Sequence, residues 1–241
     1  GVTFLPDGSG VSYETEVSVL CFDNTRTVTS VSDISSICIN MEHSYAKDLD
    51  FFLECPNGQE MLLADMYSSD LYGFNYIGEP VDNDEGASIP GTGFDYCFSP
   101  VGVDGNYYDV SNIQLCDYVD NSGNIEVGVS QIKSGDYLID GDWNDLIGCP
   151  LNGDWIIKVT DNLVEDNGYV FGWEMSFDPS IPRSESTTFT QNIVSESWNT
   201  APITNTGNVT VTPSVAGEEN FTYTVVDDFG CSYEYDVSFT V

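Results

Sequence analysis

A turn and a strand follow one another in Asn152-Gly153-Asp154-Trp155-Ile156-Ile157-Lys158-Val159-Thr160. The opening Asn-Gly-Asp is typical of a tight turn, and the residues that follow are rich in the aromatic and β-branched types that strands prefer. Residues 171–177 have the same character and predict a further strand. This part of the chain is therefore expected to form β-strands.

The rest of the sequence has the same texture, because sustained helical periodicity is missing and short apolar or alternating runs recur between polar turns. Such runs predict strands over residues 11–22, 36–41, 49–53, 74–77, 94–98, 113–118, 209–212, 221–226 and 233–241. Asp227-Asp228-Phe229-Gly230 is expected to form the turn between the last two. The predicted fold class is all-β.

Two prolines in Asp178-Pro179-Ser180-Ile181-Pro182 predict a stiff domain boundary near residue 180. Residues 1–180 would form one β domain. Residues 181–241 are enough for a small immunoglobulin-like β-sandwich, either partial or serving to join subunits.

The composition excludes several classes of partner. Forty Asp and Glu residues against five Lys and Arg give a net charge of −35, which makes nucleic acid and anionic membrane surfaces poor partners. No apolar run approaches the roughly 20 residues of a membrane span. Hydrophobic residues make up 41% of the chain and aromatic residues 13%, which is too many for a disordered polyanion. We expect a folded, very acidic segment of a processed or longer protein.

The cysteines predict an oxidising compartment. None of the seven lies in a Cys-x-x-Cys pair, and a single histidine leaves no zinc spacing. Structural disulfides in a secreted or cell-surface protein are therefore expected, with a pairing that the sequence leaves open. The six candidates in the first domain are Cys21, Cys38, Cys55, Cys97, Cys116 and Cys149, and Cys231 stands alone in the second.

Short Asp/Asn/Gly loops suggest calcium, because Ca²⁺ takes six to eight oxygen ligands from carboxylates, amides and backbone carbonyls. The candidate ligands are Asp48, Asp82, Asp84, Asp140, Asp142, Asp161 and Asp166. The alternative is that these residues form turns and carry solvated surface charge.

Aromatic residues in loop-like stretches suggest a second surface, which could bind a glycan or a protein. The candidates are Tyr72, Phe74, Tyr107 and Tyr108, and filling of the core beneath long loops would explain them equally well. The only histidine, His43, is expected to be buried in a strand rather than catalytic, since no Gly-x-Ser-x-Gly elbow supplies a nucleophile. We do not expect an enzyme.

Two stretches carry a family resemblance. Residues 151–173, Leu-Asn-Gly-Asp-Trp-Ile-Ile-Lys-Val-Thr-Asp-Asn-Leu-Val-Glu-Asp-Asn-Gly-Tyr-Val-Phe-Gly-Trp, resemble the closing motif of proprotein convertase P domains. Residues 39–50, Ile-Asn-Met-Glu-His-Ser-Tyr-Ala-Lys-Asp-Leu-Asp, followed by Leu53-Glu-Cys-Pro-Asn-Gly58, are similar to an upstream motif of that family. The surrounding cysteines are not in the convertase pattern and resemble a variant found in large secreted surface proteins of gliding Bacteroidota. The tail containing Phe221-Thr-Tyr-Thr-Val-Val-Asp-Asp-Phe-Gly-Cys231 is similar to the immunoglobulin-like repeats of those adhesins.

The resemblance implies a jelly roll of the galactose-binding-like class that stabilises or targets rather than catalyses. The expected function is a calcium-stabilised structural and adhesive module of a secreted surface adhesin or extracellular filament. Its partners would be other copies or neighbouring domains of the same surface protein. The alternatives are an accessory domain of a secreted subtilisin-like protease, and a glycan-binding module.

Overall fold

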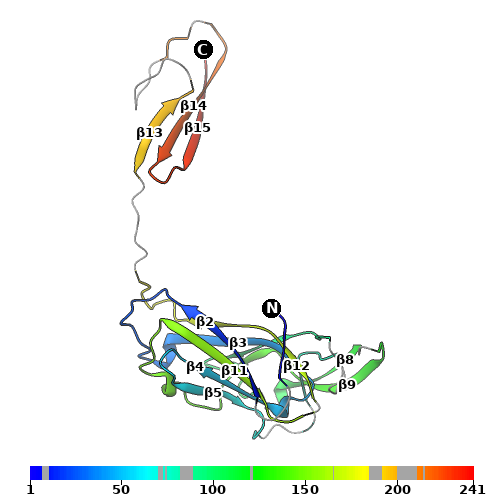
Figure 1. The fold of residues 1–241 in the computed structure, drawn as a ribbon. Helices are drawn as coiled ribbons and strands as arrows, with labels where there is room; N and C mark the ends of the chain where they lie inside the picture. Colours follow the sequence, from blue (N-terminus) through cyan, green and yellow to red (C-terminus); the bar gives the residue numbers. More distant parts are fainter. Residues whose placement is uncertain are drawn as a thin grey trace. The chain divides into compact units, whose positions relative to one another are not determined.

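The computed structural model describes residues 1–6, 11–69, 73, 75–81, 89–119, 122–164, 166–184, 192–199, 211–213 and 215–241. The chain divides into two compact units, Gly1–Ser184 and Glu185–Val241. The boundary expected from the prolines lies near residue 180, at the end of the first unit. Each unit is built from strands, so the all-β fold class is confirmed (Figure 1).

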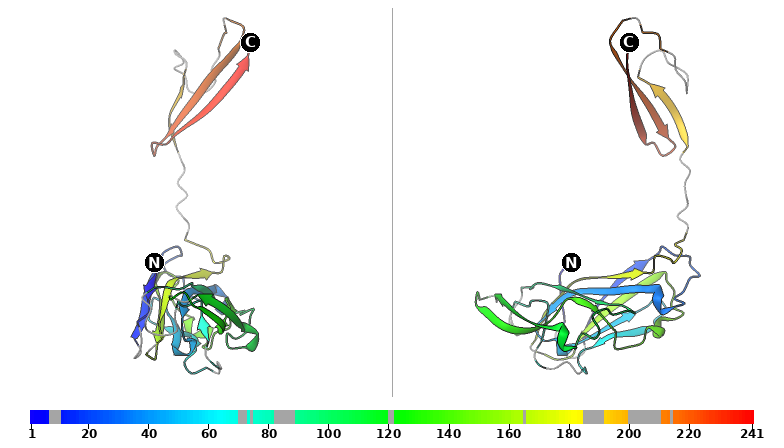
Figure 2. Two further views of the ribbon diagram at one scale, coloured as in Figure 1. Left: turned by 90° about the vertical axis from the view of Figure 1, so that its right-hand side faces the viewer. Right: turned by 180° about the vertical axis from the view of Figure 1, so that it is seen from behind.

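The first unit contains two sheets (Figures 1 and 2). The larger has eight strands, in which β1, β12, β3, β6, β9 and β8 follow one another, and β7 pairs with both β3 and β10. Its strands are β1 (Thr3–Phe4), β3 (Ile34–His43), β6 (Tyr76–Ile77), β7 (Phe94–Phe98), β8 (Ile113–Val119), β9 (Ile125–Ile132), β10 (Gly135–Tyr137) and β12 (Gly168–Phe177).

The smaller sheet has the order β2-β11-β4-β5 and is antiparallel throughout. Its strands are β2 (Val11–Val19), β4 (Leu49–Glu54), β5 (Glu60–Asp65) and β11 (Gly153–Asp161). Four short 3₁₀ turns join strands in the described residues: η1 (Val31–Asp33), η2 (Ala46–Asp48), η3 (Val110–Asn112) and η4 (Trp143–Leu146).

The hydrophobic core receives side chains from both sheets. Phe51 of β4 contacts Phe98 of β7, with ring centroids 6.2 Å apart, and Trp155 of β11 contacts Phe177 of β12 at 5.9 Å. Along β11 every second residue from Trp155 to Asp161 is buried. This is the two-residue period of a strand that packs one face against the core. The indole Nε1–H of Trp155 donates to the Leu151 carbonyl at 3.1 Å, so this buried polar atom is satisfied. The sandwich is therefore held mainly by apolar burial between its sheets.

The second unit contains one antiparallel sheet in its described residues, made of β13 (Ile193–Trp198), β14 (Glu218–Asp227) and β15 (Ser232–Thr240). The predicted turn after β14 is confirmed, since Asp227 Oδ1 accepts from the Phe229 and Cys231 amides at 3.0 and 2.8 Å. The strand predicted at 209–212 falls partly outside the described residues, and Val211 and Thr212 are not in a strand. A sandwich needs a second sheet, so the immunoglobulin-like fold stays a prediction.

Candidate functional site

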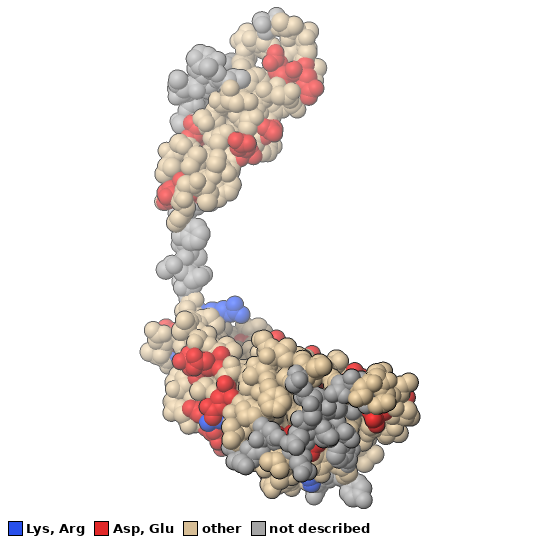
Figure 3. Space-filling view, turned by 45° about the vertical axis from the view of Figure 1, so that its right-hand side comes forward, with Lys and Arg blue, Asp and Glu red and all other residues tan. Residues whose placement is uncertain are grey.

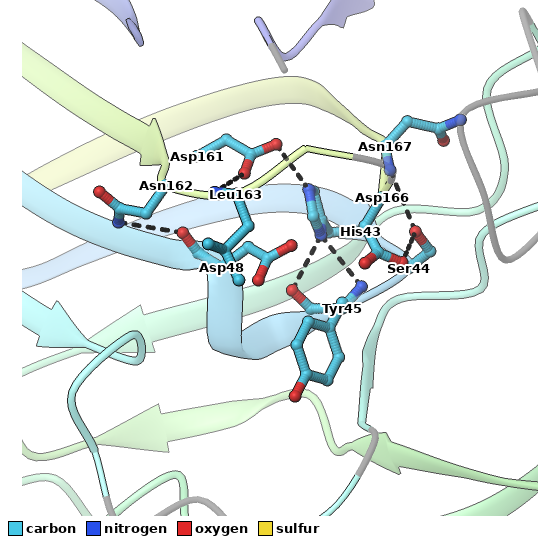
Figure 4. A network of polar contacts seen from close by, with 9 residues as sticks. All are labelled: His43, Ser44, Tyr45, Asp48, Asp161, Asn162, Leu163, Asp166 and Asn167. Atoms are coloured by element: carbon cyan, nitrogen blue, oxygen red, sulfur yellow. Dashed lines mark hydrogen bonds and ion pairs between the residues drawn. The ribbon is translucent and has the colours of Figure 1, made fainter. Parts of the chain in front are cut away.

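The polar network at the ends of β3 and β11 joins the two sheets of the first unit (Figure 4). His43 ends β3, Asp161 ends β11, and both side chains are buried. The imidazole Nε2 lies 3.3 Å from Asp161 Oδ2. Nδ1 lies 3.1 Å from both the amide nitrogen and the carbonyl oxygen of Tyr45, and Nε2 faces the Asp161 carboxylate, which accepts. Asp161 Oδ1 accepts from the Leu163 amide at 3.2 Å.

A second part of the network ties the end of β3 to the start of β12. The Ser44 hydroxyl donates to Asp166 Oδ1 and accepts from the Asn167 amide, both at 3.0 Å. The Ser44 amide donates to the Asn167 carbonyl at 3.0 Å. Ser44 is buried, so these contacts replace the water that its hydroxyl would otherwise bind.

Asp48 enters the same network from η2. Its side chain is completely buried, and its carbonyl accepts from the Asn162 backbone amide at 2.8 Å and from the Asn162 side chain at 3.0 Å. The same Asn162 amide group donates to Asp50 Oδ2 at 2.8 Å. The structure thus gathers three predicted calcium ligands, Asp48, Asp161 and Asp166, in one network (Figure 4).

Oxygen atoms of this kind suit Ca²⁺ in their chemistry. Across the described ranges, however, no three His, Cys, Asp or Glu side chains are arranged so that they could hold one metal ion. The donor types fit calcium, but the three carboxylates do not form a closed coordination shell.

Asp140 lies in a different place. Its Oδ2 accepts from the Tyr107 hydroxyl at 2.7 Å and from the Asp65 amide at 2.8 Å. Asp65 and Asp140 also line a surface hollow of about 280 Å³ with Ser68 and Tyr108.

The prediction that Tyr107 is a surface aromatic is wrong. Its side chain is completely buried in the core, and burial together with the neighbouring Asp140 raises the pKa of its hydroxyl. The ring contacts that of Tyr108 edge to face, with centroids 5.0 Å apart. Tyr108 is half-buried against the core. Tyr107 therefore fills the core beneath a long loop, which was the alternative explanation of the aromatic candidates.

Asp142 is the N-cap of η4. Its Oδ1 accepts from the Asn144 amide at 2.9 Å and from the Asn144 side chain at 2.7 Å, and these hydrogen bonds lower the pKa of its carboxyl. This is the behaviour of a turn-forming aspartate. The candidates Asp82, Asp84, Tyr72 and Phe74 lie outside the described residues.

The sequence prediction did not include Asp65. It pairs across the sheet with Asp50, and burial together with the nearby Asp65 charge raises the pKa of the Asp50 carboxyl. Asp50 lies near the start of β4 and Asp65 ends β5, so only the antiparallel pairing of these two strands places them side by side. The local sequence carries no signal for this pair, because the strand register that forms it is known only from the structure.

Four of the six predicted cysteines form disulfides, Cys38–Cys97 and Cys55–Cys149. The first joins directly paired residues of β3 and β7, and the second joins the end of β4 to the segment before β11. The prediction is wrong for Cys21 and Cys116, which are free thiols like Cys231. Cys116 lies on β8, which pairs with the cysteine-free β9, and Cys21 follows β2, which pairs with the cysteine-free β11.

No family model, curated protein or solved structure matches this chain significantly. The part of the chain that the structure describes contains no helix long and apolar enough to cross a membrane. The convertase resemblance therefore remains one of sequence motifs. Its two stretches fold into neighbouring parts of the molecule, the first into the end of β3, η2 and β4, and the second into β11 and β12. Figure 4 shows the place where these stretches meet.

Proposed function

We propose that this chain is a structural and adhesive module of a secreted surface protein, non-catalytic and stabilised by calcium. The observation that carries the proposal is the complete burial of His43 and Asp161. A hydrolytic triad would need this histidine to face a substrate, whereas here both ring nitrogens are engaged by Asp161 and Tyr45 inside the sandwich. The pair ties one sheet to the other, which is a structural role.

The disulfides support an extracellular location, because they persist in oxidising compartments. The charge of −35 makes nucleic acid and anionic lipid poor partners for this module. Figure 3 shows acidic side chains on both units and few basic ones.

The calcium part of the proposal rests on two completely buried carboxylates in one network, those of Asp48 and Asp161. Burying a carboxylate is costly unless its charge is compensated, and His43 lies against Asp161 in this network. The three carboxylates are not arranged around one ion, so a divalent cation would bind beside one or two of them, where it would supply positive charge.

The thermal unfolding midpoint tests this part of the proposal. It is measured in millimolar Ca²⁺, in Mg²⁺ and in excess EDTA at matched ionic strength, so that screening of the net charge is not taken for binding. We expect Ca²⁺ to raise Tm well above the values in Mg²⁺ and EDTA, and Asp166→Asn to remove the rise. Asp142→Asn is the matched control and should keep the rise, because Asp142 caps η4 away from the network. Equal midpoints in Ca²⁺ and Mg²⁺ would remove calcium from the proposal.

A second candidate function is an accessory domain of a secreted subtilisin-like protease. It is favoured by one observation, namely that both convertase-like stretches contribute to the same buried network. The gene sequence around this chain decides between the two. A catalytic domain encoded upstream would favour the protease, and further β repeats would favour the adhesin.

A further inference from the structure

The β8–β9 hairpin ends the larger sheet and extends from the rest of the first unit (Figure 1 and the right-hand view of Figure 2). Within the described ranges β8 pairs with β9 alone. Among the described residues, the outer side of β8 therefore presents backbone N–H and C=O groups with no strand against them. Such an edge is a template for pairing with another chain.

The hairpin also exposes aliphatic side chains. Leu115 and Val119 of β8 are 74% and 61% exposed, and Ile125 and Val127 of β9 are 68% and 72% exposed. Val119 lies directly opposite Ile125 in the ladder, so these side chains share the solvent face. Proteins commonly protect an edge with lysine or proline, and β8 has neither.

Two carboxylates, those of Glu79 and Asp117, lie near this edge. Asp117 is exposed on β8, and its Oδ1 accepts from the Gly128 amide of β9 at 2.7 Å, which holds the bulge in the hairpin. Burial raises the pKa of the Cys116 thiol, and the nearby charges of Glu79 and Asp117 raise it further. Residues 113–132 contain no lysine or arginine.

We propose that the outer edge of β8 binds an extended segment of another protein in which aliphatic residues alternate with lysine or arginine. The segment adds a strand through backbone hydrogen bonds, its aliphatic side chains cover Leu115 and Val119, and its cations point to the opposite face, on the side of Cys116 and the nearby Glu79. Charge decides against a second copy as the occupant, because each chain carries −35 and two such edges would repel. The inference does not depend on calcium, so failure of the calcium experiment would leave it standing.

Peptide binding tests the proposal. The probe is a labelled peptide of about eight residues that alternates valine and lysine, long enough to cover one strand. A serine–lysine peptide of equal charge and a valine–glutamate peptide serve as controls, in about 150 mM salt to suppress long-range attraction. Fluorescence anisotropy should show the valine–lysine peptide binding at least about tenfold more tightly than either control. Equal binding of the two lysine peptides, or no binding of the valine–lysine peptide, would overturn the proposal.

Two double variants locate the surface. Leu115→Ser with Val119→Ser should weaken binding at least about tenfold. Val101→Ser with Val103→Ser is the matched control, because these valines are 73% and 72% exposed but lie outside any strand, and it should bind like the unaltered chain. Equal weakening in both variants would refute the assignment to β8.

Hydrogen exchange provides a readout that does not depend on the variants. On the unaltered chain, the valine–lysine peptide should slow amide exchange in Ile113–Val119 and leave β15 unchanged. Binding without this protection would refute strand addition. Sedimentation of the chain alone tests the other occupant, since self-association that Leu115→Ser with Val119→Ser abolishes would assign the edge to a second copy instead.

Discussion

His43 Nε2 and Asp161 Oδ2 lie 3.3 Å apart in the interior of the first unit, and they belong to strands of opposite sheets. The contact connects two residues that are 118 positions apart in the chain. A hydrogen bond of this kind in a buried site fixes how the ends of the sheets meet, because neither group can exchange its partner for water.

Removal of either partner of the buried pair should be costly. Asp161→Ala leaves the imidazole N–H of His43 buried without its acceptor, and we expect a loss of about 3 kcal/mol in the free energy of unfolding. Urea unfolding followed by tryptophan fluorescence measures it, and most of the tryptophans lie in the first unit. The double variant with His43→Ala should lose less than the sum of the single variants. Strictly additive losses would mean that the two side chains do not interact.

The native chain should contain three reactive thiols. An aromatic disulfide reagent should modify Cys21 and Cys231 quickly because both are exposed. Cys116 should react more slowly, since it is half-buried and neighbouring carboxylates disfavour its thiolate. Cys116→Ser should remove the slow phase alone. A single reactive thiol would indicate a third disulfide and contradict the structure.

Two glycines with positive φ should respond differently to alanine. A Cβ at Gly78 (φ +59°) would lie 2.6 Å from the Thr92 carbonyl oxygen and 2.8 Å from that of Met41, whereas one at Gly58 (φ +84°) would meet nothing within 4 Å. Gly58→Ala should cost only about 1 kcal/mol of backbone strain. Gly78→Ala should cost about 3 kcal/mol or more, because backbone atoms must also move. Chemical unfolding of both variants compares them, and equal losses would show that the strands around Gly78 relax freely.

Neutralising Asp50 should stabilise the protein in a pH-dependent way. Its carboxyl has a raised pKa in the folded state, mainly through burial, so the ionised form opposes folding as pH rises through that value. Asp50→Asn should therefore raise Tm at pH 7, and the rise should vanish below about pH 3, where the carboxyl is protonated in both states. Differential scanning fluorimetry across this range measures it. Ser68→Ala nearby is the control and should show no such pH dependence, and a rise that persists at low pH would contradict the account.

Local pattern predicted most of the strands. Residues 155–160 form most of β11, as predicted. Alternation of large apolar residues gives a strand one apolar face, and that face packs on a core whichever strands lie beside it. The sequence pattern missed β9, which carries apolar residues on its exposed face and has Gly128 at positive φ in its middle. It also missed β5, where Met61, Leu62, Leu63 and Ala64 form a continuous apolar run without alternation. Exposure and bulges are set by neighbouring strands, so they leave little trace in the local sequence.

The candidate site was predictable only as a list of residue types. Asp161 and Asp166 are candidates because each is followed by an asparagine, and Asp48 because it lies two residues before Asp50. The role of each depended on pairing: Asp161 faces His43 inside the sandwich, while Asp142 turns back on its own 3₁₀ turn. The prediction of a surface position for Tyr107 is wrong because the side chain of a loop residue can still point into the core.

The sequence by itself determined that the chain is an acidic, folded, all-β protein, because composition and the two-residue period depend only on residue type and order. Tertiary structure alone decided which cysteines pair, which aspartates meet and which strand edge stays uncovered. The physical reason is register. Cys38 opposes Cys97 and Asp50 opposes Asp65 only once particular strands lie side by side, and a shift of one residue would turn each side chain to the other face.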